Sequence, residues 1–160
     1  MTVFILKGAF QEIERHILSA YPEEGCGVMI GEVPTNFGHS ECEIRVSEVR
    51  SLKNAWEGSV KTRRYLADDK ALAQIEMEYA GKSEGIVGIY HSHPDVAAWP
   101  SPFDLERAWP CYAYLILSVS RGKIEDARVW GLSEDSRGFL EGNLKKVQES
   151  CFVNLVSSRK

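Results

Sequence analysis

The sequence predicts a mixed α/β (α+β) fold in which one sheet has helices packed against it. Two observations favour this class. Apolar residues recur at helical spacing in two segments, and short apolar runs bounded by glycine or turn residues are typical of strands. The length of 160 residues fits one compact domain spanning 1–160, without a repeat, low-complexity tract or long linker to divide it.

In the first half of the chain, the pattern predicts one helix and two strands. Ala9 to Tyr21 places its apolar residues at helical spacing, and Pro22 stops the helix. Cys26 to Ile30 is a short apolar run between glycines, which indicates a buried strand. Glu41 to Val46 alternates strictly between apolar and polar residues, as a half-exposed strand does.

The middle of the chain predicts a second helix and a central strand. Asp68 or Asp69 can cap this helix, which ends near Gly81. Gly85 to His91 is apolar on both faces, as expected of a strand inside a sheet.

The remaining elements are a short helix and further strands. Ser101 begins the helix, and Pro110 terminates it. Cys111 to Val119 and Ala127 to Leu132 are predicted strands. Phe139 to Val147 fits either a hairpin or a helix.

Composition and charge exclude some classes of partner. The net charge is −4 and no block of lysine and arginine is present, which argues against nucleic acid or an anionic membrane surface. The apolar run from Val3 to Leu6 is too short for a signal peptide, and no run approaches a membrane span. We therefore expect a cytoplasmic protein, while the oligomeric state stays open.

The cysteines and two of the histidines favour structural interpretations. The four cysteines are widely spaced and form no C-x-x-C pair, so we expect buried thiols in a reducing compartment; they are Cys26, Cys42, Cys111 and Cys151. His16, inside the first helix, and His39, in a loop, are interpreted as surface residues.

His91 and His93 form the first candidate for a functional site. Residues i and i+2 of a strand point to the same side, so both imidazoles would project together if the strand continues to Pro94. Two converging imidazoles suit a metal such as zinc. The alternative is that they are ordinary surface or core histidines.

Ser101 and Asp104 extend this candidate. Serine at the N-cap, Pro102 at the first helical position and an acid at the third would also stabilise a helix start without any further role. If Asp104 is a third ligand, one tetrahedral position stays open for water, as in catalytic zinc sites. Four protein ligands would instead close a structural site.

Glu24 is the candidate general base. It lies just before the apolar strand that begins at Cys26, where its carboxyl group could enter a cleft. Glu23 and Glu24 could equally be solvated loop charges, because glutamate is almost always exposed.

Together these pieces form the pattern H-x-H-x7-S-x2-D, which resembles the JAMM (MPN-plus) metalloprotease family. "PEEGCGVMIG" resembles the family's P-x-E-x-C-G strand and matches its glutamate to Glu24. "IVGIYHSHP" resembles the strand leading into the motif, and Asn54 with "RRYLADDKAL" resembles the segment before its helix. The similarity is strongest over 10–132 and implies a single MPN-like domain with a central, mostly antiparallel sheet flanked by helices.

The resemblance also implies roles for the individual residues. His91, His93 and Asp104 would hold one Zn²⁺ per chain. Glu24 would be the general base for zinc-bound water, and Ser101 would donate a hydrogen bond to the oxyanion or the scissile carbonyl.

The family hydrolyses peptide or isopeptide bonds after the C-terminal Gly-Gly of ubiquitin-like proteins. This short chain is similar to the compact prokaryotic-type members, which implies a small sulfur carrier of the ThiS/MoaD kind or another ubiquitin-like protein as the partner. Trp56 and Trp99 could line a slot for the Gly-Gly tail, or they could be core or rim residues. The alternatives are an inactive MPN-type protein-binding scaffold, a zinc amidohydrolase acting on a small substrate, and a structural metal site.

Overall fold

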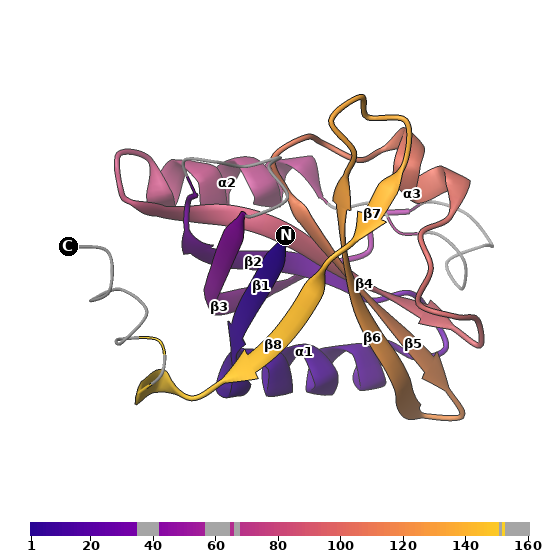
Figure 1. Cartoon of the computed structure of the whole chain (residues 1–160). Helices are drawn as coiled ribbons and strands as arrows, with labels where there is room; N and C mark the ends of the chain where they lie inside the picture. The colour runs from indigo at the N-terminus through magenta and orange to yellow at the C-terminus, as the bar shows by residue number, and fades with distance from the viewer. Residues whose placement is uncertain (35–41, 57–64, 66–67, 151, 153–160) are drawn as a thin grey trace.

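The computed structural model describes residues 1–34, 42–56, 65, 68–150 and 152. These described residues form eight strands and three helices (Figure 1). In chain order they are β1 Thr2–Leu6, α1 Lys7–Ala20, β2 Cys26–Glu32, β3 Glu43–Leu52, α2 Asp69–Tyr79, β4 Glu84–Pro94, α3 Pro102–Glu106, β5 Ala113–Ser120, β6 Lys123–Leu132, β7 Phe139–Glu141 and β8 Asn143–Val147.

The strands form one sheet in the order β7-β6-β5-β4-β2-β3-β1-β8. Among the described residues, four of its seven pairings are antiparallel, and the parallel ones join β4 to β5 and β1 to β3 and β8. The mixed α/β class and the mostly antiparallel sheet are therefore confirmed. The extent of a single domain over 1–160 stays a prediction.

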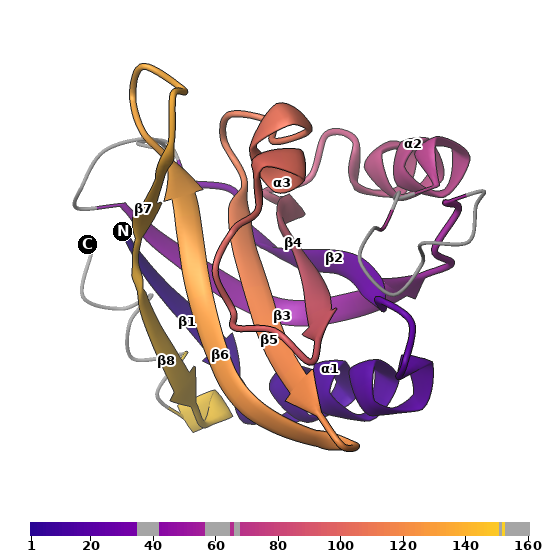
Figure 2. The ribbon, with the colours of Figure 1, turned by 90° about the vertical axis from the view of Figure 1, so that its right-hand side faces the viewer.

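The segment from Phe139 to Val147 is neither a hairpin nor a helix, so both alternatives were wrong. Its two strands pair with different neighbours: β7 with β6, and β8 with β1. Figure 2 shows β7 continuing directly into β8. At the bend, the backbone N–H of Gly142 donates to Val129 and that of Asn143 donates to Met1. One segment therefore supplies both outermost strands of the sheet.

The two faces of the sheet are covered by different helices. α1 packs its buried Phe10, Ile13 and Ile17 against one face, in the largest apolar cluster. α2 packs Leu72 and Ile75 against the other face. Figures 1 and 2 place α1 and α2 on opposite sides of β2 and β4. We call the second side the α2 face.

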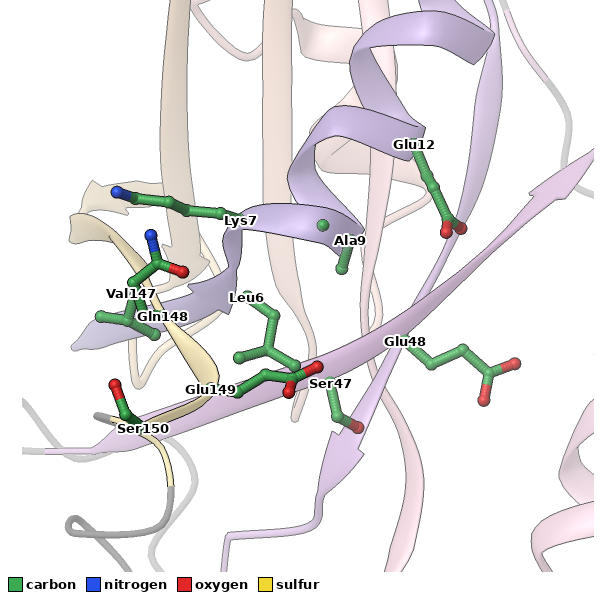
Figure 3. Close-up of a pocket in the computed structure, with 11 residues that line it drawn as sticks. Leu6, Lys7, Ala9, Glu12, Ser47, Glu48, Val147, Gln148, Glu149 and Ser150 are labelled. Atoms are coloured by element: carbon green, nitrogen blue, oxygen red, sulfur yellow. The ribbon is translucent and has the colours of Figure 1, made fainter.

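A hollow of about 430 Å³ lies where the start of α1 meets β3 and the end of β8. Figure 3 shows the carboxylates of Glu12, Glu48 and Glu149 around it. None of its lining residues is a predicted site residue.

Several element boundaries differ from the expectation. α1 begins at Lys7, two residues early, while α2 starts after its Asp68 cap as predicted. α3 ends at Glu106 and does not continue to Pro110. Just beyond α3, the hydroxyl of Tyr114 bonds both the N–H and the C=O of Trp109, at 2.6 and 3.2 Å, so these groups make no helical bonds.

Two expectations about single side chains were wrong. Cys111 is exposed, whereas Cys26 and Cys42 are buried as expected. His16 is half-buried, and its Nδ1 lies 3.0 Å from the hydroxyl of Tyr90 because α1 packs directly on that part of β4.

Other expectations cannot be compared with the structure. Cys151 and His39 lie outside the described residues. No helix in the described part of the chain is long and apolar enough to cross a membrane, and the cytoplasmic location stays a prediction.

The close pairing of β4 and β5 gives a stability prediction at Gly88. A Cβ at this position would overlap the carbonyl oxygen of Ala113. We expect Gly88→Ala to lower the free energy of unfolding by about 1–3 kcal/mol, as overpacking does elsewhere. Urea unfolding measures the change. The control is Gly8→Ala in α1, where a Cβ meets no atom within 4 Å; it should leave stability equal or slightly higher. Equal stabilities of Gly88→Ala and the unaltered chain would contradict the close pairing.

Candidate metal centre

Three buried side chains converge on the α2 face of the sheet. His91 and His93 come from the end of β4, and Asp104 comes from α3. One ligand atom from each lies within 4.8 Å of the other two, and each residue is 0–6% exposed. The pair of histidines and the aspartate that the sequence singled out are therefore brought together.

The strand geometry of β4 explains the convergence of the histidines. β4 continues through Pro94, held by β2 on one side and β5 on the other. Alternation along the strand turns His91 and His93 to one face and Tyr90 to the other, where Tyr90 packs in the α1 cluster. The strand therefore extends beyond the predicted end at His91, and the condition under which both imidazoles project together is met.

A hydrogen bond to the following loop orients His93. Its Nδ1 lies 3.1 Å from the carbonyl oxygen of Ala97. The carbonyls on either side of Ala97 accept hydrogen bonds from Ser118 Oγ at 2.7 Å and from Trp130 Nε1 at 3.1 Å. Because a carbonyl only accepts, Nδ1 of His93 carries a proton, so Nε2 is the nitrogen that would offer its electron pair to a metal ion after losing any proton it holds toward Asp104.

The first turn of α3 fixes Asp104. Ser101 Oγ accepts from the Asp104 N–H at 3.2 Å, and the Asp104 carboxylate accepts from the Ser101 N–H at 2.6 Å, which is a capping box. Ser101 Oγ also donates to Asp104 Oδ2 at 2.7 Å. Ser101 and Asp104 therefore cap the helix and also present the Asp104 carboxylate to the centre. Ser101 lies at the centre with its hydroxyl proton directed to Asp104.

The donor set fits a tetrahedral metal ion. The Nε2 atoms of His91 and His93 are 3.1 Å apart, and they lie 3.2 and 3.5 Å from the two carboxylate oxygens of Asp104. Donors at 2.0–2.1 Å from a tetrahedral zinc ion are separated by about 3.3–3.4 Å. Two nitrogens and one carboxylate are also the ligand types of catalytic zinc. These residues could hold one ion with little rearrangement.

Electrostatics within the group favour a charged aspartate. Burial raises the pKa of Asp104, but hydrogen bonds from His91, His93 and Ser101 outweigh it and hold the pKa below its usual range. Burial lowers the pKa of His91. For His93, burial also acts to lower the pKa, but bonding to Asp104 and Ala97 raises it above the usual value. The cluster therefore carries a carboxylate that would balance part of a cation's charge.

Glu24 lies buried beside these residues, 5% exposed, so the interpretation as a solvated loop charge is wrong. Burial raises its pKa to about 8, with His93 acting to lower it and Asp104 to raise it. Its backbone is clamped: Asn54 Nδ2 donates to the Glu24 carbonyl at 3.0 Å, and Gly25 bonds Ser92 through both N–H and C=O. Glu23 remains exposed.

The two tryptophans have different surroundings. Trp56 packs edge-on against Phe103, the neighbour of Asp104, with ring centroids 5.4 Å apart. Trp99 is 54% exposed and packs on Trp130 at 5.0 Å. Trp56 therefore lies close to the metal ligands, while Trp99 lies over β6. Contact of either with a substrate stays a prediction.

Tyr65 is a neighbour of the centre that the sequence reasoning did not single out. Its ring stacks on that of His91, with centroids 4.3 Å apart. It also lines a pocket of about 360 Å³ together with Phe103, Asp104 and Trp109. No local pattern in the sequence indicates this contact, since it joins residues far apart in the chain.

Known proteins are similar to this chain in sequence and in fold. The family described as prokaryotic homologs of the JAB domain matches residues 6–132. A probable TtuB-protein conjugate cleaving protease from Thermus thermophilus is 29% identical over 119 residues, covering 74% of this chain and 72% of that protein. The desampylase of Haloferax volcanii is 34% identical over 99 residues, covering 61% of this chain and 63% of that protein.

A solved structure agrees with these sequence relatives. A JAB1/MPN domain protein from Archaeoglobus fulgidus superposes with a TM-score of 0.51 at 15% identity, covering 91% of this chain and 100% of that chain, which supports the fold alone. The family match extends over most of the chain and includes every residue of the H-x-H-x7-S-x2-D pattern. The chain therefore belongs to the family of prokaryotic homologs of the JAB domain, and the resemblance to JAMM proteins is confirmed.

Proposed function

We propose that this chain is a zinc-dependent peptidase that cleaves the bond joining the C-terminus of a ubiquitin-like or sulfur-carrier protein to its adduct. The observation that carries the proposal is the convergence of His91, His93 and Asp104 beside the buried carboxyl group of Glu24. A structural site would be closed by a fourth protein ligand, and the described residues supply three.

Within this proposal, the three residues hold one zinc ion per chain. When bound by these residues, the ion would lower the pKa of a coordinated water to about 7. The capping box keeps Asp104 charged and oriented, and the Ala97 carbonyl keeps the correct nitrogen of His93 directed inward.

Glu24 acts as the general base. Its carboxylate takes a proton from the attacking water and later delivers a proton to the leaving amine. Without a metal, burial raises the pKa of Glu24 to about 8. A cation bound beside it would lower this pKa toward neutral pH or below, so that the carboxylate can accept a proton. The clamped peptide that follows Glu24 limits how far the carboxyl group can move during the reaction.

Ser101 donates a hydrogen bond to the carbonyl oxygen as negative charge develops on it. In the structure, its hydroxyl proton is directed to Asp104 Oδ2 at 2.7 Å, so this role requires a rotation of the hydroxyl toward substrate. A donor of this kind contributes roughly 3 kcal/mol to transition-state stabilisation.

The names of two relatives support the substrate class. One is named for cleaving TtuB–protein conjugates and the other as a desampylase. We infer cleavage after a C-terminal Gly-Gly, because two residues without bulky side chains can enter a narrow slot next to buried ligands. Trp56, beside Phe103, is proposed to line this slot; Trp99 would do so from the rim.

A change of Glu24 to glutamine should separate catalysis from metal binding. Glu24→Gln keeps the shape of the side chain but cannot accept the proton, so we expect turnover to fall by roughly 10²–10⁴-fold with zinc content unchanged. A cleavage assay and elemental analysis on the same sample measure both. Glu23→Gln, at the exposed neighbour, is the matched control and should remain fully active. Near-normal turnover in Glu24→Gln would show that another group is the base.

Asp104→Ala should abolish metal binding. The loss removes one of three ligands and the only carboxylate among them, so zinc should fall from about one ion per chain to near zero after dialysis. The matched control is Glu106→Ala, an exposed acid on the same helix, which should keep its zinc. If the unaltered chain takes up no zinc under reducing conditions, the protein is a binding scaffold and the enzyme proposal fails.

The substrate class is tested with matched protein fusions. A sulfur-carrier protein joined through Gly-Gly to a reporter should be cleaved, whereas the same fusion ending in Ala-Val should be cleaved far more slowly. Mass spectrometry of the released carrier locates the cut. Equal hydrolysis of simple dipeptide amides and of the Gly-Gly fusion would favour an amidohydrolase of small substrates and would overturn the proposed class.

A further inference from the structure

The two histidines of the centre are held in different ways. His93 directs its outward nitrogen to the Ala97 carbonyl. His91 is 0% exposed, and its Nδ1 finds no hydrogen-bond partner within the described part of the chain. Metal-bound histidines usually donate this second N–H to a carbonyl or carboxylate, which fixes the plane of the ring. Among the described residues, no outer hydrogen bond of this kind fixes the ring of His91.

An aromatic ring covers His91 directly. The rings of Tyr65 and His91 stack with centroids 4.3 Å apart and planes inclined by 24°. The contact is made through the ring faces, so it restrains rotation of the imidazole out of its plane. No comparable ring stacks on His93 among the described residues; its aromatic neighbour is His91 itself, tilted by 55°.

Tyr65 is itself held from two sides. It packs against the apolar cluster that contains Leu72 and Ile75 of α2, and also against the cluster that contains Ile89 and Tyr114 of the central strands. These two clusters flank the metal ligands on the α2 face. A ring wedged between them has little freedom to leave the imidazole that it covers.

We propose that Tyr65 is a positioning residue that fixes the imidazole of His91 by stacking, in place of the outer hydrogen bond that orients His93. The inference rests on the proposed metal centre. Tyr65 also forms a wall of the pocket of about 360 Å³ beside Asp104, so its ring separates His91 from that space. Loss of the ring would open a path for water to His91 and free the imidazole to rotate.

The affinity for zinc tests this role without any use of the enzyme's activity. Each purified chain competes for zinc with a chromogenic chelator, which gives a dissociation constant. Tyr65→Phe retains the flat ring and should bind within about twofold of the unaltered chain. Tyr65→Leu retains apolar bulk without a flat face and should bind roughly 10–100-fold more weakly, the range found for lost outer-shell partners.

A second tyrosine provides the control for general loosening of the fold. Tyr79 packs in the same α2 cluster but makes no ring contact with His91 in the described structure. Tyr79→Leu should therefore leave the zinc dissociation constant unchanged. The visible absorption spectrum of the cobalt-substituted chains gives a second reading: it should shift in Tyr65→Leu and be preserved in Tyr65→Phe and Tyr79→Leu, because the ligand geometry changes only in the first.

The outcomes separate this inference from the proposed function. Zinc binding by the unaltered chain, with equal affinity and an equal cobalt spectrum in Tyr65→Leu, overturns the positioning role and leaves the metal centre standing. Equal weakening in Tyr65→Phe and Tyr65→Leu also overturns it, because the hydroxyl would then be the group that matters. Absence of zinc binding in the unaltered chain overturns both.

Discussion

Side chains alternate across β4, and both the core and the candidate metal centre depend on this alternation. One face of the strand gives Tyr90 to the large apolar cluster under α1, while the other gives His91 and His93 to the centre. β2 and β5 pair with the strand on both sides up to its end, so the two imidazoles cannot turn away independently. A shift of register by one residue would exchange the faces and place both histidines in the apolar core.

Each polar group at the centre is held in place by a different local interaction. The strand directs the histidines, a capping box directs Asp104, a loop carbonyl orients His93, and a stacked ring covers His91. Burial of so many ionisable groups would be costly if they were left unpaired. Here their mutual hydrogen bonds offset much of that cost and keep the carboxylate charged, which leaves a preorganised site for a cation.

The hydrogen bond between Gly25 and Ser92 links the segment that carries Glu24 to the strand that carries His91 and His93. Ser92 lies between the two histidines, on the opposite face of β4, and its hydroxyl accepts from the Gly25 N–H at 2.9 Å. Because Glu24 directly precedes Gly25, this hydrogen bond also fixes the position of Glu24 relative to the strand that carries the histidines. The segment that contains β7 and β8 pairs with β6 at one end and with β1 at the other. It supports the centre indirectly, because Trp130 of β6 holds the loop that follows His93.

The sequence by itself determined the fold class, most of the strands and helices, and the candidate metal-binding residues. These depend on periodicity, capping residues and a four-part motif whose spacing is local, from His91 to Asp104. Only the tertiary structure decided that Glu24 is buried, that Tyr65 covers His91 and that residues 139–147 join two sheet edges. These features arise from contacts between segments that are far apart in the chain. Such contacts produce no periodic pattern of apolar residues in the sequence of either segment. The polar Glu24 could be solvated by every local criterion, and only the packing around it removes the water.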